Sequence, residues 1–515
     1  MEYITIGIVL VPLLLSFIAS VFNQNKAGGI FIQIFAFLFF LSALIIFLYP
    51  LDSPTIPIPS VIWKLLTLSV TVAFSIRAVF GKRYGLSFFL FVQSAVLIVT
   101  EITVSLNEPA PFLFYNHSEK LILLFGAFII ASLIPLLARY MSKNTIQPAQ
   151  KKQTLMASFM LMSAFAGLIA AKSLTGLFLF WQLCYGANHL FVKACGKHED
   201  IKYRRISLIR QIALTIWLSV NGAIFFSEGY TKISDINMAA GNMSGLLCAI
   251  SLITAIIMGL LVPEENVLDV FLGKRVPYMG FSAVILSLMS QFAVLQKLEP
   301  LFSSLNHSMI SLVIVLGALL MAAAAYYAST AQKVAEIPAC MVLYVFGWGL
   351  ASAFTGAENQ IFTTGYTIVS AITVAFLFCL VMAKDYSDMD TGLKRLKCNY
   401  PFISNLMIIG MISFLFVPFY TGLNRIVFID FLTDYPVSML IVIASFAVFT
   451  AATFKWVIAI MTSGKKGITE KRSFPVSFKI AVAILFLASL GTNLLSGRIY
   501  RYFLLEINFS GYLPA

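Results

Sequence analysis

The sequence has very little charge: only 11% of its 515 residues are Asp, Glu, Lys or Arg. A soluble globular chain carries about a quarter of its residues in these four types. Hydrophobic residues make up 60% of the chain, and the mean hydropathy is +0.92. The composition therefore excludes a soluble fold and predicts an integral protein of the lipid bilayer.

The sequence also lacks the motifs that hold redox cofactors and metals. Its six cysteines form no CxxC pair, and its four histidines are scattered along the chain. No Gly-x-Gly-x-x-Gly motif follows a predicted strand. We therefore expect no cofactor, no metal site and no catalytic residue. If the chain is part of an oxidoreductase, it is a part that handles no electrons.

Acidic residues are scarcer than basic ones, and the formal net charge is +13. The basic residues lie in short loops between apolar runs and do not alternate with aromatic residues. This arrangement argues against nucleic-acid binding and makes the basic residues a topology signal instead.

The apolar runs predict an all-α polytopic membrane protein with about 16 transmembrane helices. Each run is long enough to cross a hydrocarbon core of about 30 Å, and none alternates with period two as a barrel strand would. The expected spans are 3–22, 30–49, 61–80, 84–105, 120–141, 153–171, 174–193, 205–226, 243–262, 277–297, 309–330, 335–355, 362–383, 400–420, 436–461 and 476–496.

The distribution of Lys and Arg supports this division. Loops after odd-numbered spans hold 23 basic residues, whereas loops after even-numbered spans hold 5. Because cytoplasmic loops are enriched in Lys and Arg, the bias predicts that both termini lie on the non-cytoplasmic side. The expected location is a bacterial-type inner (cell) membrane or an organellar inner membrane.

Two stretches interrupt the apolar pattern with proline and glycine. The first, LLVPEENVLDVFLGKRVPYMG, contains Pro263 and Pro277, and the second, FVPFYTGLNRIVFIDF, contains Pro418 and Gly422. Proline cannot continue a regular helix, so both stretches are candidates for broken helices that free backbone groups for ions. An ordinary loop between two helices explains each stretch equally simply.

Polar groups inside the apolar runs mark candidate sites. Gln182 follows Trp181 in the middle of SLTGLFLFWQLCYGANHLFVK, while Arg210 and Lys455 lie well inside other spans. A charge inside a membrane helix is costly unless it faces protein or water, so Arg210 and Lys455 are functional candidates, and Gln182 is a candidate because it is a polar group at mid-helix. The alternatives are an ion pair or an interfacial position.

The order of these segments resembles the antiporter-like membrane subunits of respiratory complex I (NADH-quinone oxidoreductase subunits L, M and N) and of multisubunit cation/proton antiporters. The resemblance runs from about Leu121 to Gly464. Family members carry a Trp-Glu pair where LTGLFLFWQLCYG has Trp181-Gln182, and their next helix opens near an Arg-Val-Gly-Asp motif, where LIRQIALTIW keeps only Arg210.

Four later motifs continue the resemblance. The segment VPYMGFSAVILSLMSQ keeps the family's proline as Pro277 but has Met289 where the family has a buried lysine. ASTAQKVAEIPA resembles the Thr-Asp-Ile-Lys-Arg-Val motif, with Lys333 in register, and SAITVAFLF has Val374 at the position of the central relay lysine. FVPFYTGLNR keeps Pro418 and Gly422 of the family's Gly-Leu-Pro-Pro-Thr-x-Gly-Phe element, with Arg425 beside its charged position.

The resemblance implies an antiporter-like architecture with three parts: N-terminal transmembrane helices over 1–119, the antiporter-like core over 120–464, and a C-terminal helix and tail over 465–515. It also implies partners, namely other membrane subunits of a hetero-oligomeric complex. Any enzymatic role would be that of a non-redox membrane subunit in an NADH-quinone oxidoreductase-like complex.

In the family, a buried acid and a buried lysine relay protons because each shifts the pKa of the other. Gln182, Met289 and Val374 cannot take part in such a relay. Substitute groups for a displaced ion path are Glu336, Lys333, Arg210, His189 and Lys455, and Arg425 is a further candidate that can pair with Asp430.

Three hypotheses remain open. The chain is a scaffold subunit of a complex I-like or multisubunit antiporter assembly, with a degenerate relay. Alternatively, it is an active subunit that conducts protons or monovalent cations through the substitute groups. The third hypothesis is a stand-alone multi-span transporter of a small solute or ion.

Overall fold

The computed structural model describes residues 2–21, 27–49, 60–103, 113, 115–142, 147–194, 201–228, 247, 249–251, 253–255, 307–331, 334, 336–352, 357–381, 397, 401–420, 434–462 and 478–492. Within these ranges nearly every residue is helical, and Leu113 and Ala171 form an isolated β bridge. The predicted all-α class is therefore confirmed. Helices satisfy their own backbone hydrogen bonds, which a bilayer requires of any spanning segment.

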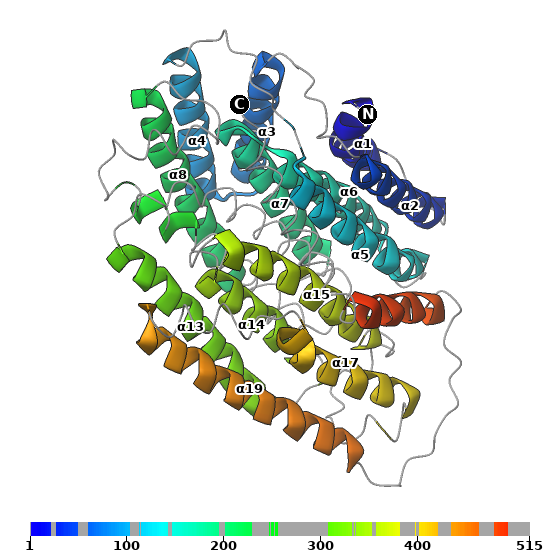
Figure 1. The fold of residues 1–515 in the computed structure, drawn as a ribbon. Helices are drawn as coiled ribbons and strands as arrows, with labels where there is room; N and C mark the ends of the chain where they lie inside the picture. Colours follow the sequence, from blue (N-terminus) through cyan, green and yellow to red (C-terminus); the bar gives the residue numbers. More distant parts are fainter. Residues whose placement is uncertain are drawn as a thin grey trace.

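The N-terminal half of the described chain contains eight helices (Figure 1). They are α1 (Glu2–Val21), α2 (Ala27–Leu48), α3 (Ser60–Phe80), α4 (Tyr84–Thr103), α5 (His117–Ser142), α6 (Pro148–Ala170), α7 (Leu174–Ala194) and α8 (Ile201–Glu228). Each coincides with one of the first eight expected spans to within a few residues. The apolar runs themselves define these helices, and more polar stretches of the sequence separate them.

The C-terminal half contains α13 (His307–Thr330), α14 (Glu336–Ser352), α15 (Ala357–Val381), α17 (Pro401–Tyr420) and α19 (Pro436–Met461), followed by a helical segment over Phe478–Thr492. Proline begins α17 and α19, where its missing N–H costs no hydrogen bond. Five described helices contain segments long and apolar enough to cross a membrane: Gly28–Leu48, Glu119–Ala138, Pro148–Ala170, Ile310–Thr330 and Pro436–Met461. The count of 16 spans stays a prediction, because 256–306 and other stretches lie outside the described residues.

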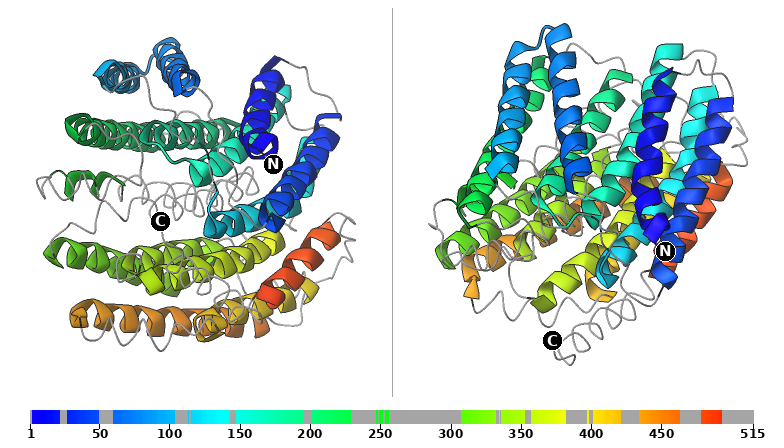
Figure 2. Two further views of the ribbon diagram at one scale, coloured as in Figure 1. Left: turned by 45° about the horizontal axis from the view of Figure 1, so that its top comes forward. Right: turned by 90° about the horizontal axis from the view of Figure 1, so that it is seen from above.

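The helices pack in two groups that meet along α5 and α15. In the first group α6 packs against α7 and α1, α5 against α2, and α4 between α3 and α8; in the second, α13 packs against α14 and α19, and α15 against α14 and α17. Figure 2 shows the two groups as successive layers. Large apolar side chains on α1–α4, among them Phe17, Phe37 and Phe88, are more than half exposed, as expected of surfaces that face lipid.

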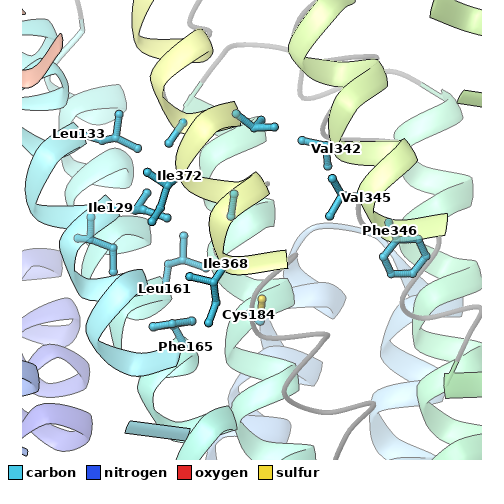
Figure 3. Close-up of a cluster of buried hydrophobic side chains, with 14 of the residues drawn as sticks. Ile129, Leu133, Leu161, Phe165, Cys184, Val342, Val345, Phe346, Ile368 and Ile372 are labelled. Atoms are coloured by element: carbon cyan, nitrogen blue, oxygen red, sulfur yellow. The ribbon is translucent and has the colours of Figure 1, made fainter. Parts of the chain in front are cut away.

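The contact between the two groups is apolar. Ile129 and Leu133 of α5, Leu161 and Phe165 of α6 and Cys184 of α7 lie near Ile368 and Ile372 of α15, with Val342, Val345 and Phe346 of α14 beyond (Figure 3). All of these side chains are buried.

Candidate functional site

Gln182 lies at mid-height on α7 and is 1% exposed. The helix begins where the sequence predicts, because the Ser173 hydroxyl accepts a hydrogen bond from the backbone N–H of Gly176 at 3.1 Å, as an N-cap residue does. The apolar run that follows carries the helix across Trp181 and Gln182 without a break. The polar interruption therefore does not bend α7 but places one amide inside the protein.

The side chain of Gln182 belongs to an amide cluster, which we define as Gln93 of α4, Gln182 of α7, and Gln211 and Thr215 of α8. Gln182 Nε2 donates to Gln93 Oε1 and, at 3.3 Å, to Gln211 Oε1, while Gln211 Nε2 donates back to Gln182 Oε1 at 3.3 Å. Gln93 Nε2 donates to Gln211 Oε1 at 3.0 Å and to Thr215 Oγ1 at 2.8 Å. Three helices are thus joined by side chains whose hydrogen-bonding groups satisfy one another.

The amide cluster is neutral and closed. Its members are at most 8% exposed, and the rings of Trp181 and Trp217 pack edge to face beside it at 5.4 Å between centroids. An amide neither gains nor loses a proton near neutral pH, so the cluster can fix helices but cannot relay protons. Interhelical hydrogen bonds of this kind contribute about 0.6 kcal/mol each in a membrane protein.

A basic cavity of about 430 Å³ lies beside the amide cluster, among α1, α3, α4, α6, α7 and α8. Gln182 and Gln211 form part of its wall, together with Arg77, Arg83, His189, Lys193 and Arg210. None of the described residues that line the cavity is Asp or Glu. The wall is therefore positive, which favours anions and disfavours the entry of cations.

Arg210 lies in this wall, one residue before Gln211. It is 4% exposed, and its guanidinium carbon lies 5.6 Å from the centroid of the Tyr185 ring of α7. A desolvated arginine over an aromatic face gains a cation–π interaction. Arg210 therefore contributes a fixed positive charge to the cavity.

Two other candidate residues lie apart from the amide cluster. Lys455 of α19 is exposed, and its Nζ donates to the backbone carbonyl of Ser329 at 2.8 Å, near the C-terminal end of α13. A cation is favourable there because it opposes the negative end of the helix dipole. Glu336 is the first residue of α14, where a carboxylate is favourable at the positive end of a helix.

The remaining candidates fall mostly outside the described residues: Lys333, Arg425, Pro263, Pro277 and Gly422. Pro418 lies in α17, which ends two residues later at Tyr420. Of the two positions that the resemblance assigns to family lysines, Met289 also lies outside the described residues. Val374 of α15 is 1% exposed and belongs to the apolar core.

The sequence reasoning missed Gln93 and Gln211, the partners of Gln182. Both are single amides near the middle of an apolar run, the same signal that drew attention to Gln182. It also treated Lys120 and Lys172 as loop charges. Lys172 Nζ contacts Glu119 Oε1 at 2.9 Å, and Lys120, 1% exposed, donates to the Tyr49 carbonyl at 3.1 Å. Two of the five basic residues on the predicted outer side are thus held by protein groups.

The fold is shared with three solved membrane complexes. A chain of the membrane-bound sulfane sulfur reductase, an archaeal respiratory membrane complex, is 14% identical with a TM-score of 0.67, and the match covers 96% of this chain and 99% of that one. A chain of respiratory complex I from Thermus thermophilus is 14% identical with a TM-score of 0.66, and the match covers 96% of this chain and 97% of that one. A chain of the Mrp complex from Dietzia sp. DQ12-45-1b is 12% identical with a TM-score of 0.57, and the match covers 92% of this chain and 96% of that one.

No family model matches the sequence, and no curated protein matches it. At 12–14% identity the likeness concerns the fold, and it extends over nearly the whole length of both chains in each comparison. The resemblance inferred from the order of motifs is therefore confirmed at the level of the fold: the chain is folded like the membrane chains of complex I-like and Mrp complexes.

Proposed function

We propose that this chain is a membrane subunit of a complex I-like or multisubunit cation/proton antiporter assembly, and that it scaffolds its partners without moving protons through the usual acid–lysine relay. The observation that carries this proposal is the amide cluster. At the position where the resemblance expects a glutamate, Gln182 is 1% exposed and bonded to Gln93 and Gln211. A relay needs a group that titrates, and none is present there.

Two further features support the scaffold role. Cys184 of α7 and Ile368, Ile372 and Val374 of α15 belong to one apolar core, so an apolar side chain stands where the resemblance expects the central relay lysine. The basic cavity beside Gln182 carries four Lys or Arg side chains, whose field repels cations that would approach the amide cluster.

The assembly role is tested by purifying an affinity-tagged chain from its native membrane in a mild detergent. We expect it to migrate on a native gel with other membrane subunits, and deletion of the chain to dissociate them. A chain that purifies as a stable lone subunit and transports a small solute in vesicles would instead support the stand-alone transporter.

The absence of a relay is tested by ion flux in vesicles that contain the assembly. Neutralising Glu336, Lys333 and Lys455 one at a time (Glu336→Gln, Lys333→Gln, Lys455→Met) is expected to leave proton and cation flux unchanged. Loss of flux in these variants, with the assembly intact, would show that the chain conducts ions through rearranged groups.

A further inference from the structure

The basic cavity is lined by both basic and apolar side chains. Phe17 of α1 and Phe80 of α3 line it and are 55% and 84% exposed, so the cavity reaches the surface between these two helices. Leu13, Val70, Met156 and Met160 add further apolar surface to its wall. A polar solute alone would leave this apolar surface uncovered, whereas an amphiphile would cover it.

Three of the four basic side chains that line the cavity lie at one level of the membrane. Arg77 near the end of α3, Arg83 before α4, and Lys193 in the last turn of α7 gather on the side that the loop charges predict to be cytoplasmic. Arg77 is exposed, and Arg83 and Lys193 are half-buried. From Lys193 the cavity wall extends along α7 to Gln182, about 16 Å deeper by the rise of a helix.

Position and chemistry together define the ligand class. Basic pockets between transmembrane helices on the cytoplasmic side suit anionic lipid headgroups, and each basic side chain near the surface contributes about a fivefold gain in affinity. We propose that the basic cavity binds one anionic phospholipid of the cytoplasmic leaflet, with its phosphate held by Arg77, Arg83 and Lys193 and an acyl chain against the deeper apolar wall of Leu13, Val70 and Met156.

The proposal is tested by calorimetric titration of the purified assembly that contains the full-length chain, in detergent. The probes are dihexanoyl phosphatidylglycerol, dihexanoyl phosphatidylcholine and inorganic phosphate, which separate an anionic lipid from a zwitterionic lipid and from a free anion. We expect saturable binding of phosphatidylglycerol alone. Equal binding of inorganic phosphate, or of phosphatidylcholine, would overturn the proposal.

The residues are tested with a matched control on the same turn. Arg83→Gln is expected to weaken phosphatidylglycerol binding about fivefold, and the double variant Arg77→Gln/Arg83→Gln about 25-fold, while Arg83→Lys stays near the parent value. Lys82 is exposed, does not line the cavity and has φ 55°, which asparagine tolerates, so Lys82→Asn removes a charge without disturbing the turn. An equal loss in Lys82→Asn would mean general surface electrostatics and would also overturn the proposal.

Discussion

Removing the side-chain amide of Gln182 is expected to destabilise the chain by about 2 kcal/mol. Gln182 makes three interhelical hydrogen bonds within the amide cluster, and each contributes about 0.6 kcal/mol in a membrane protein. Leucine is close to glutamine in volume, so Gln182→Leu removes the bonds with little cavity cost. The free energy of unfolding is measured by titrating the detergent-solubilised chain with SDS and following tryptophan fluorescence.

A double-mutant cycle isolates the bond between Gln182 and Gln93. The coupling energy of Gln93→Leu and Gln182→Leu is expected to be about 0.6 kcal/mol or more, because one direct hydrogen bond joins the two side chains. Gln33→Leu is the matched control: Gln33 is exposed on α2, and its exchange is expected to change stability by less than about 0.5 kcal/mol. If Gln182→Leu is no more destabilising than Gln33→Leu, the amide cluster does not hold α4, α7 and α8 together.

Three further perturbations follow from packing and charge. Gly317→Ala should separate α13 from α14 and destabilise the chain by at least about 1–3 kcal/mol in the same SDS titration, because an added Cβ would lie 2.4 Å from the Ala351 backbone nitrogen. Gly7→Ala is the control, because the space around Gly7 is open. Equal effects of the two substitutions would contradict a close crossing of α13 and α14. Glu119→Gln should lower the free energy of unfolding by about 1–3 kcal/mol, since the Glu119 carboxylate accepts hydrogen bonds from Lys172 Nζ at 2.9 Å and from the Asn116 N–H at 2.8 Å. If the effects of Glu119→Gln and Lys172→Gln are fully additive in the double variant, the two side chains are not coupled. Lys455→Met should lower the free energy of unfolding by less than about 1 kcal/mol, because the hydrogen bond from Lys455 to the Ser329 carbonyl lies at the surface. A larger decrease, measured by thermal unfolding, would mean that this contact fixes α13 against α19.

The sequence predicted the helices well because each helix is a local feature. An apolar run of sufficient length in a membrane can satisfy its backbone only as a helix, so α1–α8, α13, α14, α15, α17 and α19 begin and end near the limits of their runs. The division into an N-terminal unit, a core and a C-terminal tail stays a prediction. Hydrogen bonds such as that from Ser163 to the Val9 carbonyl tie α6 of the expected core to α1.

The candidate residues show where local reasoning ends. Lys455 lies inside an apolar run, yet its side chain emerges at the surface and meets the end of another helix, 126 residues away in the chain. A lysine stem is long enough to carry its charge out of an apolar segment. The position of Lys455 within its apolar run therefore did not determine whether its side chain is buried.

The sequence by itself determined that this is an all-helical membrane protein, where its described helices lie, and that an amide stands where the resemblance expects a glutamate. Only the tertiary structure decided what that amide contacts. Gln93 lies 89 residues before Gln182 and Gln211 lies 29 residues after it. Their meeting depends on how α4, α7 and α8 pack, which no local pattern records. The same packing brings Arg77, Arg83, Lys193 and Arg210, from three helices and a turn, to the wall of one cavity.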